Sequence, residues 1–506
     1  MTPRRFVLVK TPRHVFVAGF FAVVIAIIAT TAIASGDRDV VRPTENFTAA
    51  EPYEQLPTGA ATSRKPINAN AFSHSSANMS FERELAFKVG NGFFRRIWVS
   101  APSSTKAADG LGPLFNAKSC QRCHLKDGRG HPPNGNWPVD NAVSMVLRLS
   151  IPPQTEEHRA LLDSGRANVI PEPTYGGQLQ DFAIQGHKAE GRMQISYREI
   201  PIQLSDGETA SLRQPTYTVT NLSYGPLRLD AMFSPRIANP MIGLGFLEAI
   251  TEVDIRAQAD PQDRNSDGIS GRVNEVWSPA HRRMILGRFG WKAGNGTVED
   301  QSAAAFSHDI GISNPDHPLG SGECTILQTT CRQATHGGDK QYSNLEVPKK
   351  VMDLVTFYAS NLAVPQRRNV NDPRVLAGKK AFYNAGCIAC HRPKYITPHD
   401  IPGKPEQSRQ LIWPYTDMLL HDMGPGLADN RPEGRADGRE WRTPPLWGIG
   451  LTEDVNGHTN FLHDGRARNL LEAIIWHGGE AEAAKTKVVN MPLEDRYNLI
   501  RFLESL

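Results

Sequence analysis

The sequence has almost no net charge and lacks the motifs of several large enzyme classes. Lysine and arginine number 56 and aspartate and glutamate 53, so the formal net charge is only +3 over 506 residues. Four positive charges and no negative ones lie in the first 34 residues, so the rest of the chain is close to neutral. This balance gives no electrostatic basis for nucleic acid binding. No catalytic-triad motif, phosphate-binding loop or glycine-rich dinucleotide motif stands out.

Cysteine is also scarce, and its arrangement is specific. Four of the six cysteines form two copies of Cys-x-x-Cys-His, at residues 120–124 and 387–391. This pentad attaches c-type haem: the thiols add across the vinyl groups, and the histidine supplies the proximal nitrogen to iron. The alternatives are a redox dithiol and a zinc site, but zinc would need more clustered ligands nearby. The sequence predicts two covalent c-type haems, with these attaching cysteines and proximal histidines: Cys120, Cys123, His124, Cys387, Cys390 and His391.

The N-terminus has the pattern of an export segment. Basic residues within the first 13 positions precede an apolar stretch over 15–33, and an Ala-x-Ala cleavage pattern ends at residue 34. The alternative is an uncleaved segment, long enough to tether the protein to the inner membrane. Either reading places the folded part in the periplasm. In that oxidising compartment we expect Cys324 and Cys331 to form a short-loop disulfide, with a reactive thiol pair as the alternative.

An internal repeat predicts the domain organisation. Segments 348–362 and 492–506 both begin with proline and place apolar residues at matching offsets, which favours one buried helical face in each. A helix before a haem motif and a helix closing the domain is the plan of a cytochrome c fold. We therefore expect a mainly α protein with two cytochrome c-like domains and long irregular insertions in the first. The expected parts are 1–34, a signal peptide or membrane anchor; 35–80, a polar arm; 81–365, the N-terminal haem domain; and 366–506, the C-terminal haem domain.

Several motifs resemble those of one known family. They include Asp-Gly-Leu-Gly-Pro-Leu-Phe-Asn at 109–116, Lys-Asp-Gly-Arg-Gly at 126–130, Asp-Gly-Ile-Ser-Gly-Arg at 267–272 and Phe-Leu-His-Asp-Gly-Arg at 461–466. Together with the haem motifs they resemble the bacterial dihaem oxidoreductase family, labelled thiol-oxidoreductase-like or putative peroxidase. That family is similar to the dihaem cytochrome c peroxidases and to the methylamine-utilisation dihaem enzyme. The resemblance covers most of residues 80–506.

The resemblance implies which residue completes the second haem. In the related peroxidases the distal ligand lies fourteen residues past the histidine of the His-Asp-Gly motif, which is His463 here. That position is His477, where methionine is more usual, and two histidines would make the second haem six-coordinate. Met423 and His421 are the alternative ligands.

The first haem is expected to have an open position. The internal repeat aligns Val253 with His477, and valine cannot bind iron. Other ligands could reach this haem from loops: His131, His158 and His187.

An open haem that reduces peroxide needs a nearby group to accept and return a proton. The related enzymes use a glutamate and a glutamine, but Ala249 occupies the glutamine position here. The nearest acids are Glu248 and Glu252, four residues apart and so on one helical face. We expect one of them to be the catalytic acid, with Gln178 and Gln180 as outside candidates.

A further pattern concerns calcium. Asp263, Asn265 and Asp267, followed by glycine, match the first half of an EF-hand loop. An Asp/Asn-rich turn is the alternative.

The expected function is that of a periplasmic dihaem oxidoreductase of the peroxidase type. The C-terminal haem would receive electrons from a small donor such as a cytochrome or cupredoxin and pass them to the N-terminal haem, where peroxide is reduced. The runner-up is a non-catalytic dihaem electron-transfer cytochrome. A third hypothesis is an oxidase that acts on a partner protein or organic substrate through high-valent iron.

Overall fold

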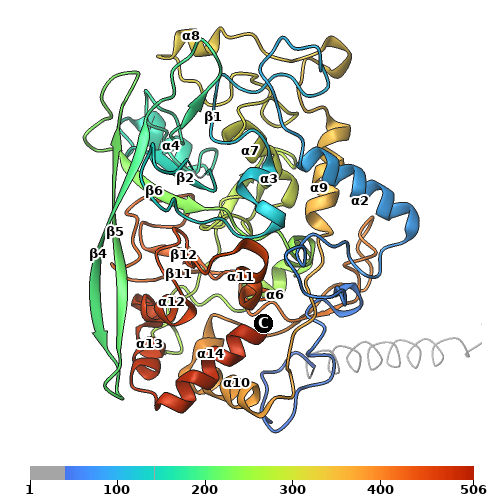
Figure 1. The fold of residues 1–506 in the computed structure, drawn as a ribbon, viewed down its shortest axis with the longest axis vertical. Coiled ribbons are helices and arrows are strands. Elements are labelled where there is room, and N and C mark those ends of the chain that lie inside the picture. The colour runs from blue at the N-terminus through green and yellow to red at the C-terminus, as the bar shows by residue number, and fades with distance from the viewer. Residues whose placement is uncertain (1–39, 142) are drawn as a thin grey trace, which may run out of the picture. The chain divides into compact units, whose positions relative to one another are not determined.

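The computed structural model describes residues 40–141 and 143–506. It contains two similar pairs of packed helices, one in each half of the chain. Helix α2 (Phe81–Phe94) packs on α9 (Lys349–Ser360), and α10 (Pro373–Ala385) packs on α14 (Leu493–Ser505), as Figure 1 shows. The helices predicted at 348–362 and 492–506 are thus confirmed. The expected export segment at 1–34 lies outside the described residues. Within the described ranges, no helix is long and apolar enough to cross a membrane.

A glycine brings the two helices of each pair into close contact. A Cβ atom at Gly90 would lie 2.2 Å from the carbonyl oxygen of Leu354, and one at Gly378 would lie 1.8 Å from that of Asn498. Only a residue without a side chain fits at either position. The two pairs therefore use the same packing device.

The expected fold class, mainly α with two cytochrome c-like domains, is wrong. Only 27% of the structure is helical and 17% is in strands. Residues Glu45–Leu506 form one compact unit. The difference arises in the long first-half insertion, which folds largely into β-hairpins and irregular segments. The proposed boundary between residues 365 and 366 stays a prediction.

The largest β element is a hairpin of β4 (Arg192–Gln203) and β5 (Thr209–Thr220), paired along its full length. It extends from the first half along one side of the unit, past β6, α12 and α13 of Figure 1. The hydroxyl of Tyr217 donates to Asp464 at 2.7 Å, and Arg468 forms an ion pair with Glu199 at 3.0 Å. The hairpin thus joins first-half sequence to the second half.

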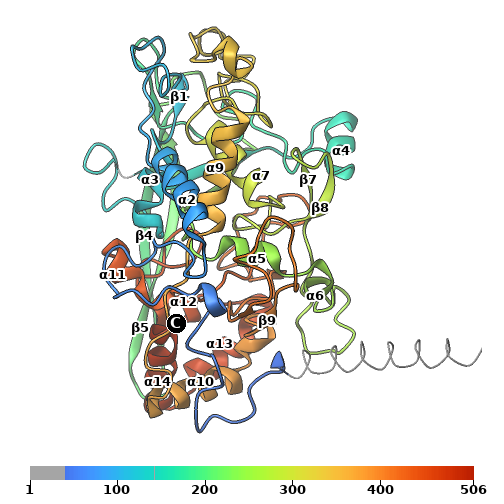
Figure 2. The ribbon, with the colours of Figure 1, turned by 90° about the vertical axis from the view of Figure 1, so that its right-hand side faces the viewer.

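The remaining elements are short and are spread through the unit (Figures 1 and 2). The other helices are α3 (Cys120–Cys123), α4 (Glu156–Asp163), α5 (Leu244–Ala249), α6 (Glu252–Arg256), α7 (Val298–His308), α8 (Thr329–Arg332), α11 (Thr452–Asn456), α12 (Leu470–Ile475) and α13 (Glu482–Val489). The other strands are β1 (Leu114–Phe115), β2 (Met145–Ser150), β3 (Phe182–Ala183), β6 (Met232–Ile237), β7 (Glu275–Ser278), β8 (Arg283–Leu286), β9 (Tyr395–Ile396), β10 (Leu411–Ile412), β11 (Leu420–Asp422) and β12 (Glu440–Arg442). They pair antiparallel as β1–β3, β2–β6, β7–β8, β9–β10 and β11–β12.

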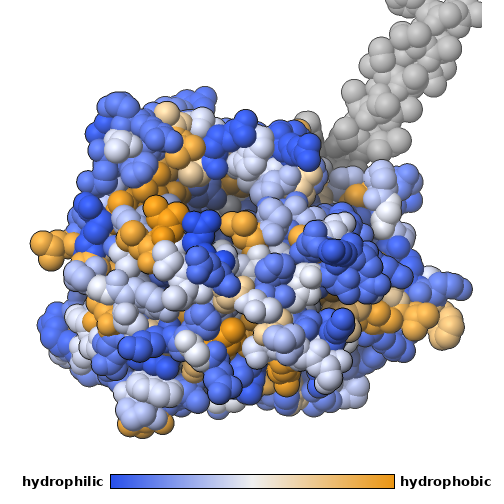
Figure 3. All heavy atoms as spheres, turned by 90° about the horizontal axis from the view of Figure 1, so that it is seen from above, coloured by the Kyte–Doolittle hydropathy of each residue, from blue (hydrophilic) through white to orange (hydrophobic). Residues whose placement is uncertain are grey.

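The hydrophobic core has three main clusters. One surrounds the second haem motif and contains Phe382 and Phe502, and another lies by the first motif and contains Phe94. The third combines first-half and second-half residues, such as Phe246 and Trp447. Seen from above, the surface is mostly hydrophilic, with hydrophobic residues in separate groups, some beside a hollow (Figure 3).

Two further links stabilise the unit, a disulfide in the insertion and ion pairs in the polar arm. Cys324 and Cys331 form the expected disulfide. In the arm, the buried carboxylate of Glu54 forms ion pairs with Arg367 and with Lys379 of α10. Residues of the arm therefore belong to the packed unit.

Candidate functional site

The first Cys-x-x-Cys-His motif forms the short helix α3 and ends at His124. The Nδ1 atom of His124 lies 2.7 Å from the carbonyl oxygen of Asn239, to which it donates a hydrogen bond. This bond fixes the tautomer and leaves Nε2 with its lone pair free. Burial lowers the pKa of His124 below its ordinary value, so the ring is neutral, as a metal ligand must be.

The second motif repeats this arrangement directly after α10. The Nδ1 atom of His391 donates to the carbonyl oxygen of Tyr415 at 2.9 Å. Burial, above all other causes, lowers the pKa of His391 to about 4. Its ring lies 6.1 Å from that of Phe382, as the ring of His124 lies 6.2 Å from that of Phe94.

The four motif cysteines are half-buried and form no disulfide. Burial raises the pKa of both Cys120 and Cys387 to about 12. Thiols of this kind stay protonated at neutral pH and are poor redox nucleophiles. The environment of both motifs is therefore unlike that of a reactive dithiol.

His477 has the same hydrogen-bond pattern as the two motif histidines. Its Nδ1 atom donates to the carbonyl oxygen of Ala473 at 2.7 Å, so Nε2 is free. The residue follows α12, and burial lowers its pKa. His477 is also near enough to His391 to contribute to the lowered pKa of that residue. The structure thus brings together the two histidines that the sequence assigned to the second haem.

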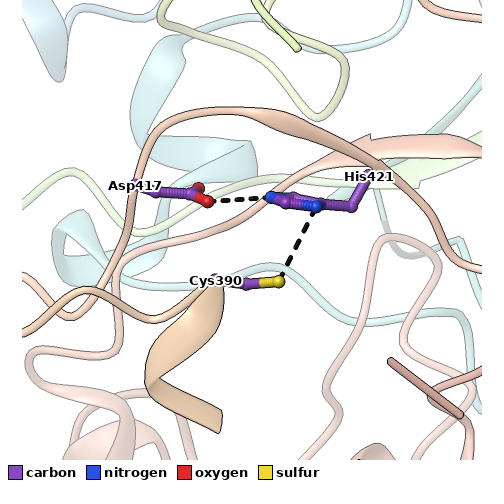
Figure 4. A group of neighbouring side chains, drawn as sticks. All are labelled: Cys390, Asp417 and His421. Atoms are coloured by element: carbon purple, nitrogen blue, oxygen red, sulfur yellow. Dashed lines mark hydrogen bonds and ion pairs between the residues drawn. The ribbon is translucent and has the colours of Figure 1, made fainter. Parts of the chain in front are cut away.

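His421, an alternative ligand, is bound elsewhere. Its Nε2 atom lies 2.8 Å from Asp417 and its Nδ1 atom 2.6 Å from Glu480. Figure 4 shows the group that His421 forms with Asp417 and Cys390, whose ligand-type atoms all lie within 4.8 Å of one another. Burial opposes the charged form of His421, but the charges and hydrogen bonds of Asp417 and Cys390 together outweigh it and raise the pKa well above the ordinary value. A protonated His421 donates to both carboxylates and has no lone pair for iron or zinc.

The first motif opens into a cavity of about 320 Å³. Its walls include Cys120, Cys123 and His124 from the motif, together with Trp291 and residues of α7. Among the described residues that line it, the arginines are Arg129, Arg148, Arg236, Arg431 and Arg442. The Nε atom of Arg431 is buried without a hydrogen-bond partner. Glu433 also lines the cavity and pairs with Arg431 at 2.7 Å and with Arg236 at 2.8 Å. A haem carries two propionates, and a cavity with a motif histidine and, among its described lining residues, five arginines against two acids, Glu433 and Asp309, fits that group.

The predicted catalytic acids lie away from this cavity. Glu248 accepts from the backbone N–H of Val298 at 2.7 Å and forms an ion pair with Lys404. Glu252 is exposed and pairs with Arg256 at 2.7 Å. Neither glutamate is among the described residues that line the cavity.

Other sequence candidates are also placed outside the cavity. Val253, the repeat counterpart of His477, is 77% exposed. His158 lies on α4 and His187 in a loop, and neither lines the cavity in the described part of the chain. Gln178 and Gln180 are buried behind it, where both side-chain amides donate to the backbone carbonyl of His308.

His308 is the functional candidate that the sequence did not reveal. It ends α7 and, with His124, is one of two histidines among the described residues lining the cavity. The guanidinium of Arg148, which also lines the cavity, lies 3.3 Å from Nδ1 of His308, and a carboxylate oxygen of Glu323 lies 3.8 Å from Nε2. Burial, followed by the charge of Arg148, lowers the pKa of His308 well below its ordinary value. Burial raises the pKa of Glu323 to about 7.

This arrangement differs from that of the three ligand-type histidines. Neither ring nitrogen of His308 is held by a backbone carbonyl, and both face charged side chains. Burial and the charge of Arg148 keep His308 neutral, so the cavity wall carries an uncharged imidazole that can act as a weak base. His308, Arg148 and Glu323 lie in the first-half insertion. That insertion has no counterpart in the internal repeat, so the spacing of residues in the sequence could not predict them.

The candidate calcium loop is an exposed turn. Asp263 accepts hydrogen bonds from the backbone N–H groups of Asp267 and Gly268, and Asn265 donates to Asp267 at 3.0 Å. These bonds are typical of an Asx turn. Calcium binding there stays a prediction.

Comparisons with known proteins agree with this geometry at the level of the family. A family model described as "Di-haem oxidoreductase, putative peroxidase" matches residues 57–506. A search of curated proteins finds no match. Among solved structures, hydrazine synthase of Kuenenia stuttgartiensis, pressurised with 20 bar xenon, is similar with a TM-score of 0.21 and 17% identity. That match covers 38% of this chain and 65% of the other, and so low a TM-score does not indicate a shared overall fold.

Proposed function

The chain belongs to the di-haem oxidoreductase, putative peroxidase family, and from this premise we propose that it is a periplasmic c-type dihaem peroxidase. Each haem would be attached through its own Cys-x-x-Cys-His motif. The second haem would take electrons from a small donor protein, such as a cytochrome or cupredoxin, and pass them to the first.

One observation supports the different roles proposed for the two haems. Two ligand-type histidines, His391 and His477, meet at the second motif, and both have a free Nε2 atom. Among the described residues that line the first cavity, His124 alone has this pattern, and the other histidine there, His308, is held between charged side chains. His131, whose Nδ1 bonds to the carbonyl oxygen of Pro132, does not line that cavity. Two strong axial ligands suit electron transfer, whereas an open position suits reaction with a small oxidant.

The side chains around the first cavity fit the reduction of peroxide. Reducing hydrogen peroxide to two waters consumes two electrons and two protons, and the haem, once bound, supplies the electron chemistry. His308 would accept a proton from bound peroxide and return it to the departing oxygen, work typically worth about 10²–10⁴-fold in rate. The charge of Arg148 would stabilise the negative charge that develops on the departing oxygen. Glu323, behind Nε2, would hold the ring so that Nδ1 faces the cavity.

The test combines spectroscopy with one pair of variants. The purified protein should show one high-spin and one low-spin haem, and cyanide should convert the high-spin signal. His308→Leu should lower peroxide-driven oxidation of a reduced cytochrome about 10²-fold or more, with cyanide still bound. The matched control is Glu252→Gln, which changes an exposed acid outside the cavity and should leave turnover unchanged.

The alternative outcomes are equally clear. If both haems are low-spin and neither binds cyanide, the protein is a dihaem electron-transfer cytochrome. If His308→Leu keeps full turnover, the proton-transfer group lies elsewhere.

A further inference from the structure

A second cavity adjoins the first, on the side of Cys123. It has a volume of about 360 Å³. Ala117, Cys123, Arg129 and Ser144 line both cavities, whereas His124 lines only the first. The second cavity therefore reaches the attachment cysteine of the first haem motif without reaching the proximal histidine.

The charged side chains among the described residues that line this second cavity are all basic. Lys118, Arg122 and Arg129 all line it, and among the described lining residues none is aspartate or glutamate. Lys118 and Arg122 are exposed, so they lie where the cavity meets solvent, whereas Arg129 is buried. Three guanidinium or ammonium groups without an acid in the wall make a site for an anion.

Arg129 is the strongest element of this site. Its residue is only 7% exposed, and its Nη1 atom has no hydrogen-bond partner. Its backbone is fixed, because its N–H donates to Asn456 at 3.0 Å and its carbonyl oxygen accepts from His458 at 3.1 Å. Burial lowers the pKa of Arg129 to about 10, so the group is still charged at neutral pH. The guanidinium lies 5.7 Å from the ring centres of both Trp291 and Phe461, but a buried donor such as Nη1 is costly unless a hydrogen-bond acceptor completes it.

The rest of the wall combines an aromatic side with a further donor. The rings of Phe115 and Phe182 stack with centroids 5.8 Å apart, and both residues line the cavity. His131 also lines it, and because its Nδ1 bonds to the carbonyl oxygen of Pro132, its Nε2 is available. An anion with an apolar body therefore matches this wall better than a small inorganic ion.

We propose that this cavity binds a small organic carboxylate, with its charged end at Arg129 and its apolar body against Phe115 and Phe182. Lys118 and Arg122 line this cavity and not the first one, so they are separate from the arginines assigned to the haem propionates, whereas Arg129 lines both cavities. The ligand would lie against the thioether edge of the first haem. Resting on the proposed function, this makes an organic carboxylate a ligand bound beside the first haem.

The experiment measures binding rather than turnover, using benzoate as the probe and its neutral isostere benzamide as the control ligand. Titration calorimetry on the dihaem protein should show saturable benzoate binding and at least about tenfold weaker binding of benzamide. The same titration with cyanide-saturated protein should give the same benzoate affinity, because His308, the proposed proton-transfer group, does not line this cavity. Arg129→Gln should weaken benzoate about tenfold or more. The matched control is Arg166→Gln, which changes an exposed arginine outside both cavities and should leave the affinity unchanged.

Several results would overturn this proposal. They are equal affinity for benzamide, loss of benzoate binding in cyanide, or unchanged binding in Arg129→Gln. If that variant loses haem, the Lys118→Gln, Arg122→Gln double variant replaces it and should weaken benzoate severalfold. Absent benzoate binding in a protein that turns over peroxide would refute the carboxylate site alone. Benzoate binding without peroxide turnover would refute only the proposed peroxidase function.

Discussion

At the scale of single residues, one hydrogen-bond pattern separates the iron-ligand candidates from other buried histidines. His124, His391 and His477 each donate from Nδ1 to a backbone carbonyl oxygen. His421 and His308 instead face charged side chains with both nitrogens. A carbonyl acceptor on Nδ1 leaves the Nε2 lone pair for a metal, whereas two carboxylates stabilise the imidazolium.

We expect His477→Ala to convert the low-spin haem into a high-spin one, because the substitution removes its second axial nitrogen. The optical and electron paramagnetic resonance spectra measure this directly. His421→Gln is the matched control: it should keep the low-spin signal, although it removes a buried cation from between two acids. A variant at His477 that stays low-spin, or one at His421 that becomes high-spin, would reverse the ligand assignment.

Glu323 should make stability depend on pH. Burial raises its pKa from about 4.5 to about 7, with Arg148 partly opposing the shift. Between these pH values the folded state binds the proton more tightly than the unfolded state does. The contribution of Glu323 to the free energy of unfolding is therefore fully present below about pH 4.5 and is lost as pH rises through 7. The effect amounts to at most a few kcal/mol, at about 1.4 kcal/mol per pKa unit.

The measurement is urea unfolding at several pH values for the wild type and Glu323→Gln. The difference between the two free energies of unfolding should change between pH 4.5 and 7 and level off outside that window, because other titrating groups cancel. A difference that stays constant across the window would show that Glu323 does not titrate there.

The sequence located some of these residues and could not locate others. The motif histidines follow from the pentad itself, and His477 follows from counting along a related family's motif. His308 and Arg148 could not be found in this way, because 160 positions separate them and only the folded insertion brings them together. The catalytic roles of Glu248 and Glu252 stay predictions, although both lie away from the cavity.

At the scale of elements, the helix pair α2–α9 offers an internally controlled test. Alanine normally stabilises a helix interior by up to about 1 kcal/mol relative to glycine. At Gly92 of α2 nothing lies within 4 Å of a new Cβ, so Gly92→Ala should be neutral or stabilising. At Gly90 of the same helix the new Cβ would lie 2.2 Å from a carbonyl oxygen of α9.

We therefore expect Gly90→Ala to destabilise the protein by about 1–3 kcal/mol, the usual cost of overpacking. Thermal unfolding of the two variants alongside the wild type measures both effects. Equal midpoints for Gly90→Ala and Gly92→Ala would mean that the helices do not pack as closely as the structure has them.

Helices were easier to predict than strands here. The proline starts and apolar spacing of 348–362 and 492–506 identified α9 and α14. The hairpin was not predicted, and each of its strands contains a proline, Pro201 in β4 and Pro215 in β5. Proline inside a run argues against a central strand. In a two-stranded sheet every strand is an edge, and prolines are tolerated where the missing donor would face away from the partner.

At the scale of the whole molecule, the two halves of the chain share a core. Core residues of both halves form one cluster, and the first-half hairpin packs on the second half. The repeat in the sequence suggested two separable domains because it shows which helices correspond. It does not show where an insertion between them will pack.

A shared core predicts that both haem sites are lost together on heating. The low-spin and high-spin absorption bands, reporting the second and first haem, should disappear at the same temperature as the far-ultraviolet circular dichroism signal.

Tyr217→Phe tests the link between the halves, because it removes a hydrogen bond to buried Asp464, worth about 1.5–3 kcal/mol for a charged acceptor. Because the hairpin that carries Tyr217 belongs to the first half and Asp464 to the second, this variant should lower all three transitions equally. Tyr224→Phe, which removes an exposed bond to the carbonyl of Lys188, is the control and should change them little. Haem bands that vanish at separate temperatures, or a shift of only one band in Tyr217→Phe, would show that the halves unfold independently despite their shared core.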